Sequence, residues 1–134
     1  MNALVVLGIV LIALAALIHV LIFFMESVLW SRPAVWKRFG LKSQPEADTV
    51  KPMAYNQGFY NVFLAIIAAT GLVMIGSNNL SGPGYALAFA AAASMVLASI
   101  VLITSSPKLW RAAAVQGVVP LVGIILLVAS LLSP

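Results

Sequence analysis

The residues of this sequence that could do chemistry are polar side chains that interrupt long apolar stretches. They are His19, Glu26, Asn56, Gln57, Tyr60, Asn61 and Gln116. His19 and Glu26 lie seven residues apart, which places them on one stripe of a helix, and the four polar residues from 56 to 61 form a second stripe. Polar groups inside a membrane are costly and mark functional sites. The pattern therefore indicates a cavity that binds a ligand, an ion or a substrate.

A simpler interpretation of the same side chains stays open. Asn, Gln, His and Tyr form hydrogen bonds between membrane helices, each worth around 0.6–2 kcal/mol. Glu26 could extend to the nearby membrane interface, and its carboxyl could be protonated by desolvation or kept ionised by amide donors. In this interpretation the polar residues hold the helices together and bind nothing.

The chain contains no cysteine and a single histidine. Without cysteine, disulfides, thiolate catalysis, zinc–thiolate sites and iron–sulfur clusters are excluded, and one histidine cannot ligate haem from both sides. These residues also provide no set of nucleophile, base and orienting group. We therefore expect no catalytic residue, no metal site and no cofactor.

Four apolar stretches must position the polar side chains, over residues 3–30, 53–75, 85–104 and 112–132. Each has the roughly 20 residues that a helix needs to cross the hydrocarbon core of a membrane. Of the 134 residues, 63% are hydrophobic and 7% are charged, which is too little charge to coat a soluble globule. That excludes a soluble enzyme and a nucleic-acid-binding module. The sequence predicts an all-α polytopic membrane protein, a four-transmembrane-helix bundle with one transmembrane domain over residues 1–134.

All seven lysines and arginines lie in two connections, residues 31–52 and 108–111. Four spans place both connections on the same side of the membrane, as the positive-inside rule requires. We therefore expect a multi-pass protein of the plasma (bacterial inner) membrane, with the basic connections cytoplasmic and both termini on the outer side. The lipid bilayer, with anionic headgroups at the basic connections, is then the expected partner, and nucleic acid is not.

The sequence also predicts a membrane interface at the basic side. Its residues are Trp30, Arg32, Trp36, Lys37, Arg38 and Trp110. Residues 31–40 are typical of a short interfacial helix, with Pro33 near its start and Gly40 at its end. In that helix Val35, Trp36 and Phe39 would face the acyl chains. A solvated loop is the alternative.

The four-span topology also predicts the depth of the polar side chains. Glu26 lies about 6 Å from Trp30 along its helix, and Gln57 and Gln116 lie about 5–7 Å from the start of theirs. We therefore expect Glu26, Gln57 and Gln116 at one level near the basic side, with His19 deeper and near Asn61.

The third apolar stretch carries a row of small residues at four-residue spacing, namely Ala86, Ala90, Ser94 and Ala98. Small residues in register let membrane helices approach closely. We expect this row to pack either inside the bundle or against another subunit.

Several short motifs together resemble one known family. They are His19-x6-Glu26, Leu29-Trp30, Phe39-Gly40-Leu41, Asn56-Gln-Gly-x-Tyr-Asn61 and Gln116-Gly117. The chain resembles the domain-of-unknown-function family number 1304, small four-helix bacterial integral membrane proteins. The resemblance covers nearly the whole chain. The resemblance implies a four-span fold and a polar patch that is best treated as a unit, and it implies no activity.

Three hypotheses for the function follow. The first is binding or transport of a small polar or amphipathic molecule at an intramembrane polar cavity near the cytoplasmic side, with oligomerisation expected because four helices are few for a pathway. The second is a structural or accessory subunit of a larger membrane complex. The third is a membrane enzyme with a site between subunits, because the size and four-span layout are similar to those of the eicosanoid and glutathione membrane enzymes.

Overall fold

The computed structural model describes residues 2–77 and 79–133, and its regular secondary structure is helical. The long helices are α1 (Ala3–Phe23), α3 (Gln44–Ile75), α4 (Ser81–Ser105) and α5 (Trp110–Leu132). The short ones are the π-helical turn η1 (Phe24–Val28), α2 (Pro33–Trp36), and the 3₁₀ turns η2 (Lys37–Phe39) and η3 (Pro107–Leu109). No strand occurs within the two described ranges, which confirms the all-α prediction.

Four helical segments are long and apolar enough to cross a membrane. They are Ala3–Val28, Gln44–Ile75, Ser81–Ser105 and Pro107–Leu132. Each presents large apolar side chains on its outer surface, for example Leu17, Ile66, Leu97 and Ile125. Water would make such a surface unfavourable, whereas lipid accepts it. The prediction of four long apolar helices is therefore confirmed, and this surface suits a multi-pass membrane protein.

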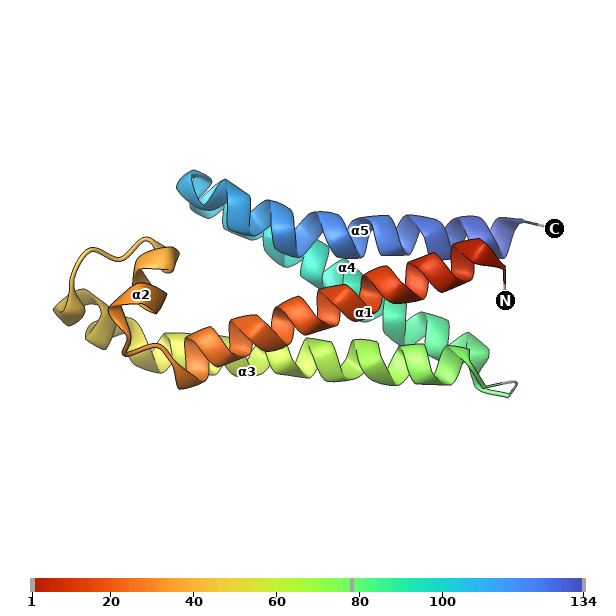
Figure 1. Cartoon of the computed structure of the whole chain (residues 1–134), viewed down its shortest axis with the longest axis horizontal. Helices are drawn as coiled ribbons and strands as arrows, with labels where there is room; N and C mark the ends of the chain where they lie inside the picture. The colour runs from red at the N-terminus through yellow and green to blue at the C-terminus, as the bar shows by residue number, and fades with distance from the viewer. Residues whose placement is uncertain (1, 78, 134) are drawn as a thin grey trace.

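The four long helices form an antiparallel bundle in which each packs mainly against two neighbours (Figure 1). α1 lies between α3 and α5, and α4 closes the ring by contacting both of these helices. Both termini lie at one end of the bundle, and α2 lies at the other (Figure 1). α1 crosses the bundle obliquely, since its first half packs on α5 and its last turns pack on α3 (Figure 1).

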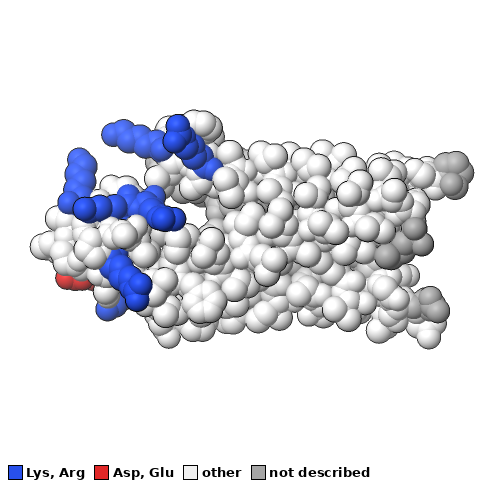
Figure 2. All heavy atoms as spheres, in the orientation of Figure 1, with Lys and Arg blue, Asp and Glu red and all other residues white. Residues whose placement is uncertain are grey.

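Charged side chains gather at the end of the molecule that is opposite to the termini (Figure 2). The seven basic residues all come from the segments 32–51 and 108–111, which lie there in the fold (Figure 1). We call this the basic end.

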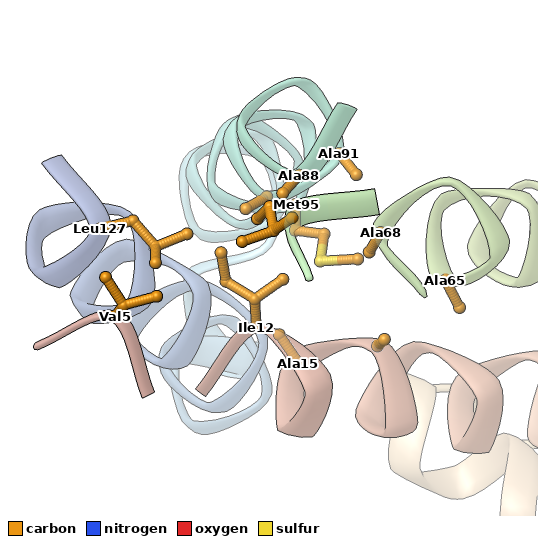
Figure 3. Packing of buried hydrophobic residues seen from close by; sticks show 12 residues of the cluster. Val5, Ile12, Ala15, Ala65, Ala68, Ala88, Ala91, Met95 and Leu127 are labelled. Carbon is orange, nitrogen blue, oxygen red and sulfur yellow. The ribbon is translucent and has the colours of Figure 1, made fainter. Parts of the chain in front are cut away.

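An apolar core fills the half of the bundle that carries the termini. Ile12, Met95 and Leu127 are fully buried and meet between α1, α4 and α5 (Figure 3). Ala68 of α3 and Ala88 of α4 belong to the same core (Figure 3), and a Cβ added at Gly71 of α3 would lie 2.6 Å from the nitrogen of Ala88. Because lipid gives helices no hydrophobic reason to associate, this dense packing supplies the dispersion energy that holds the bundle.

Glycines bring the backbones close together in the same half. A Cβ added at Gly84 of α4 would lie 2.6 Å from the nitrogen of Ile75 in α3. One added at Gly123 of α5 would lie 2.8 Å from Cγ1 of Ile12 in α1. Any larger residue at these positions would push the helices apart.

α3 begins at Gln44, well before the expected start of the second span at residue 53. Ser43 caps the helix, because its Oγ accepts a hydrogen bond from the Glu46 nitrogen at 3.3 Å, and Pro45 suits the first turn. The helix then continues through Pro52. The expected span was drawn from its apolar residues, so it missed a polar extension that projects from the apolar part of α3.

Residues 31–43, which we call the cap, fold back on this extension. Trp36 is 4% exposed and belongs to a buried cluster with Ala47 and Ala54 of α3. Gly40 ends the short helical segment with a φ of 86°, as its position in the sequence predicts. Trp36 was expected to face acyl chains, but its ring is covered by protein because α3 starts early enough to pack against it.

The row of small residues on the third span faces outward. Ala86, Ala90, Ser94 and Ala98 are exposed. The side of α4 that faces the bundle carries Gly84, Ala88, Ala91, Ala92, Met95 and Ser99. The row therefore does not pack inside the bundle, which removes one of its two expected positions.

Candidate functional site

A π-helical turn positions Glu26 at the end of the first span. The turn covers Phe24–Val28, and the Leu29 nitrogen donates a hydrogen bond to the Phe24 oxygen at 2.9 Å. A π turn inserts one extra residue per turn and so redirects the side chains that follow, which is why such turns are frequent at functional sites. Here it leaves Glu26 only 8% exposed, at the contact between α1 and α3.

Gly58 of α3 lets the helix backbone reach this turn. A Cβ at this position would overlap Ser27 Oγ and would lie 3.1 Å from Cβ of Glu26. Ser27 Oγ also donates a hydrogen bond to the Tyr55 oxygen at 2.8 Å. The turn and α3 are therefore joined by direct side-chain-to-backbone contact.

The carboxyl of Glu26 is bound by an amide from α3. Asn61 Nδ2 donates to Glu26 Oε2 at 2.9 Å and to the Gln57 oxygen at 3.1 Å. Asn61 is itself buried. Two of the predicted site residues, from different spans, thus form one buried polar pair.

A cavity of about 350 Å³ opens beside this pair, and we call it the Glu26 cavity. It is lined by Glu26, Trp30, Val50, Met53, Ala54, Asn56 and Gln57. Trp30 is fixed in its wall, because its Nε1 donates a hydrogen bond to the Ala47 oxygen at 2.9 Å. The cavity therefore combines one carboxyl and two amide side chains with an apolar wall.

Three of the predicted site residues lie away from the Glu26 cavity. His19 is buried and its Nδ1 bonds the Ala15 oxygen of its own helix at 2.9 Å. Tyr60 is 57% exposed on the outer side of α3. Gln116 lies on α5 next to Gly117. Gly117 packs against α4, because a Cβ added at Gly117 would overlap Ser99 Oγ. α1 has crossed towards α3 at this level, so α5 packs against α4 and Gln116 does not reach Glu26.

Sequence reasoning missed the apolar residues of the cavity wall. Val50, Met53 and Ala54 share one face of α3 with the predicted residue Gln57, because the four follow the spacing i, i+3, i+4 and i+7. This spacing was available in the sequence. The expected span starts at residue 53, so Val50 was assigned to a loop and the other three residues to a helix. The shared face was therefore not recognised.

The predicted interface residues occupy two kinds of position. Trp30 and Trp36 are buried between the cap and α3, and Trp36 Nε1 donates to Gln44 Oε1 at 3.1 Å. Trp110 is 53% exposed, with the guanidinium carbon of Arg111 5.3 Å from its ring centroid. Arg32, Lys37 and Arg38 are exposed on the cap.

No group of three His, Cys, Asp or Glu side chains that could hold a metal ion occurs in the part of the chain that the structure describes. At the Glu26 cavity, Glu26, Asn56 and Gln57 can form hydrogen bonds, and a carboxylate at Glu26 can pair with a cation.

Comparison with known proteins gives one match. Residues 13–128 match the family described as "Protein of unknown function (DUF1304)". No curated protein and no solved structure matches the chain.

Proposed function

Because the chain belongs to the DUF1304 family, whose description assigns no activity, we propose a function from the site itself. We propose that this protein is a membrane protein that binds a small amphipathic molecule in the Glu26 cavity. The observation that carries the proposal is that an acid inside an apolar span lines a cavity of about 350 Å³. An acid at this position costs free energy, which favours a functional role for its carboxyl.

The polar part of the cavity suits a head group that donates hydrogen bonds. A carboxylate accepts up to about four hydrogen bonds, and Asn61 provides one of them to Glu26. Asn56 and Gln57 are exposed at the cavity and add amide donors and acceptors. An amine or a hydroxyl could therefore bond to Glu26 and to an amide at the same time.

The apolar part of the cavity suits a short hydrocarbon chain. Val50, Met53 and Ala54 provide aliphatic contacts on α3. The N–H of Trp30 is already bonded to Ala47, so its ring contributes apolar surface. The cavity is largely open to its surroundings, so a chain bound there would keep part of its surface uncovered.

The rest of the bundle supports binding more than conduction. Ile12, Met95 and Leu127 are fully buried between the Glu26 cavity and the termini, so a polar route through the bundle would have to cross this apolar core. In the orientation that we propose from the positive-inside rule, the basic end faces the cytoplasm and both termini face outward. A ligand would then enter from the cytoplasmic leaflet or from the water beside it.

The experiment compares three six-carbon amphiphiles with the purified protein in detergent: hexylamine, hexanol and hexanoate. Thermal unfolding is measured while each is titrated. We expect hexylamine and hexanol to raise the melting temperature, because both can donate a hydrogen bond to the carboxylate of Glu26. Hexanoate should leave it unchanged, because its own carboxylate is repelled by that of Glu26. In Glu26→Gln the affinity for hexylamine should fall about tenfold, the value of one charge-assisted hydrogen bond.

Glu46→Gln is the matched control, because Glu46 is exposed on the first turn of α3 and does not line the cavity. This variant should bind hexylamine as the wild type does. Identical thermal shifts for the wild type and Glu26→Gln with all three amphiphiles would contradict the proposal.

A further inference from the structure

A second cavity lies on the other side of the cap, between the cap and the turn that joins α4 to α5. Its volume is about 320 Å³. It is lined by Phe39, Gly40, Ser105, Ser106, Pro107, Lys108 and Leu109. It shares no lining residue with the Glu26 cavity. The basic end is recessed, and basic side chains border the recess (Figure 2).

The charge around this cavity favours an anion. Lys108 lines it from the α4–α5 turn, and Arg111 follows shortly after. Lys37 and Arg38 directly precede Phe39, which lines it from the cap. All four basic residues are exposed, so their side chains can rotate towards an anion bound in the cavity.

The two acids of the basic end lie elsewhere. Glu46 Oε2 accepts a hydrogen bond from the backbone nitrogen of Lys42 at 2.9 Å. Asp48 Oδ1 accepts a hydrogen bond from Gln44 Nε2 at 2.8 Å. Both acids are on the first turns of α3, and neither lines the second cavity. An anion in this cavity would therefore meet Lys108 without a carboxylate in the wall.

The neighbouring surface indicates that the anion belongs to a lipid. α4 reaches the cavity with Val101 and Ile103 exposed on its last turns, which offers a path for acyl chains. Trp110 is exposed directly after the cavity residues, and indole rings in such positions are typical of the headgroup layer. Ser106 lines the cavity and carries a hydroxyl that can donate a hydrogen bond. Basic pockets between membrane helices are known to bind lipid headgroups.

We propose that the second cavity binds the phosphate group of an anionic phospholipid, which bridges the cap and the α4–α5 turn. Lys108 supplies the positive charge and Ser106 a hydroxyl donor. This site differs from a general attraction of basic residues for anionic lipid, because it assigns the binding to one cavity and to one lysine that lines it.

The test measures the affinity of phosphatidylglycerol for the purified full-length protein by titration in detergent, with native mass spectrometry to count bound lipid. Lys108→Gln should weaken binding about tenfold, because it removes one charge-assisted hydrogen bond. Lys42→Gln is the matched control: it removes the same charge from the basic end outside the cavity, and should change the affinity less than twofold. Equal losses in the two variants would overturn the proposal. Both are first compared with the wild type in lipid-free melting temperature.

Two further titrations separate the possible sources of the phosphate. Phosphatidylcholine has the same phosphate with a compensating cation, and it should bind at least several-fold more weakly than phosphatidylglycerol. Inorganic phosphate should bind far more weakly still, because it lacks acyl chains. Equal affinity for phosphatidylcholine, or for inorganic phosphate, would overturn the assignment to an anionic lipid. Glu26→Gln should retain the affinity for phosphatidylglycerol, so this result is independent of the Glu26 cavity.

Discussion

Replacing Gly58 by alanine tests how closely α3 must approach the π-helical turn. The added methyl group would overlap Ser27 Oγ and would lie 3.1 Å from both the Glu26 Cβ and the Ser27 nitrogen. The nitrogen is a backbone atom and cannot rotate away. Either the two helices separate, or Ser27 gives up its hydrogen bond to the Tyr55 oxygen.

The magnitude follows from three contributions. Overpacking of a tight contact costs about 1–3 kcal/mol. Loss of the Ser27 hydrogen bond adds about 1 kcal/mol. The higher helix propensity of alanine offsets about 1 kcal/mol of this. We therefore expect Gly58→Ala to lower the free energy of unfolding by about 1–3 kcal/mol. It should also weaken hexylamine binding, because the turn that carries Glu26 has to move.

The assay is reversible unfolding in mixed micelles by titration with sodium dodecyl sulfate, followed by circular dichroism. Gly82→Ala is the control, since a Cβ at Gly82 of α4 meets nothing within 4 Å. The control should be unchanged or up to about 1 kcal/mol more stable. Adding Ser27→Ala to Gly58→Ala should restore part of the stability by removing the overlapping oxygen. The reasoning is wrong if Gly58→Ala is as stable as the wild type, or if the double variant recovers nothing.

Two further predictions concern the elements that hold the site. Asn61→Leu should lower the free energy of unfolding by about 0.6–2 kcal/mol in the same titration, because it removes the hydrogen bond to Glu26 inside the bundle; an unchanged value would show that this bond adds no stability. Ser43→Ala should lower the free energy of unfolding by about 0.5–2 kcal/mol, because it removes the N-cap hydrogen bond from the Glu46 nitrogen to Ser43 Oγ. It should speed amide hydrogen exchange in the first turns of α3, and unchanged exchange there would contradict the capping role.

The four spans could be predicted because length and apolar composition determine them. A run of about 20 apolar residues has few alternatives to a membrane helix, and this holds for each of the four. The start of α3 could not be obtained in this way. Its first turns are polar, and they are helical because Ser43 caps them and Trp36 packs on Ala47. The N-cap residue Ser43 can be read from the sequence. The packing of residues 31–43 on α3 depends on the tertiary fold.

The candidate site was predictable in its residue types and not in its lateral arrangement. The rise per residue gives the level of a side chain along a helix, so it placed Glu26 and Gln57 together near the basic side. The rise per residue does not indicate which neighbouring helix a given helix packs against. α1 leans from α5 towards α3, and this brings Glu26 to Asn61 while Gln116 stays on the far pair of helices. His19 Nδ1 forms a hydrogen bond with the Ala15 oxygen of its own helix. The spacing of residues in the sequence cannot distinguish such a histidine from one that binds a ligand.

The glycine contacts and the position of the apolar core together account for the cavities at the basic end. Near the termini, Gly84 holds α4 against α3 and Gly123 holds α5 against α1, and the filled apolar core joins these two pairs. At the basic end, Gly58 ties α3 to the π-helical turn, and Gly117 ties α5 to α4. Among the described residues no glycine contact joins these two pairs at that level. The pairs diverge there, which leaves room for the cap (Figure 1).

The cap separates the two cavities and is itself a packed unit. Trp30 lines the Glu26 cavity and Phe39 lines the second cavity, and the centroids of their rings are 5.1 Å apart. Trp30 is also hydrogen-bonded to the Ala47 oxygen, so the shared wall is anchored to α3. The two cavities therefore lie on either side of one aromatic contact, at the end of the molecule where the basic side chains gather (Figure 2).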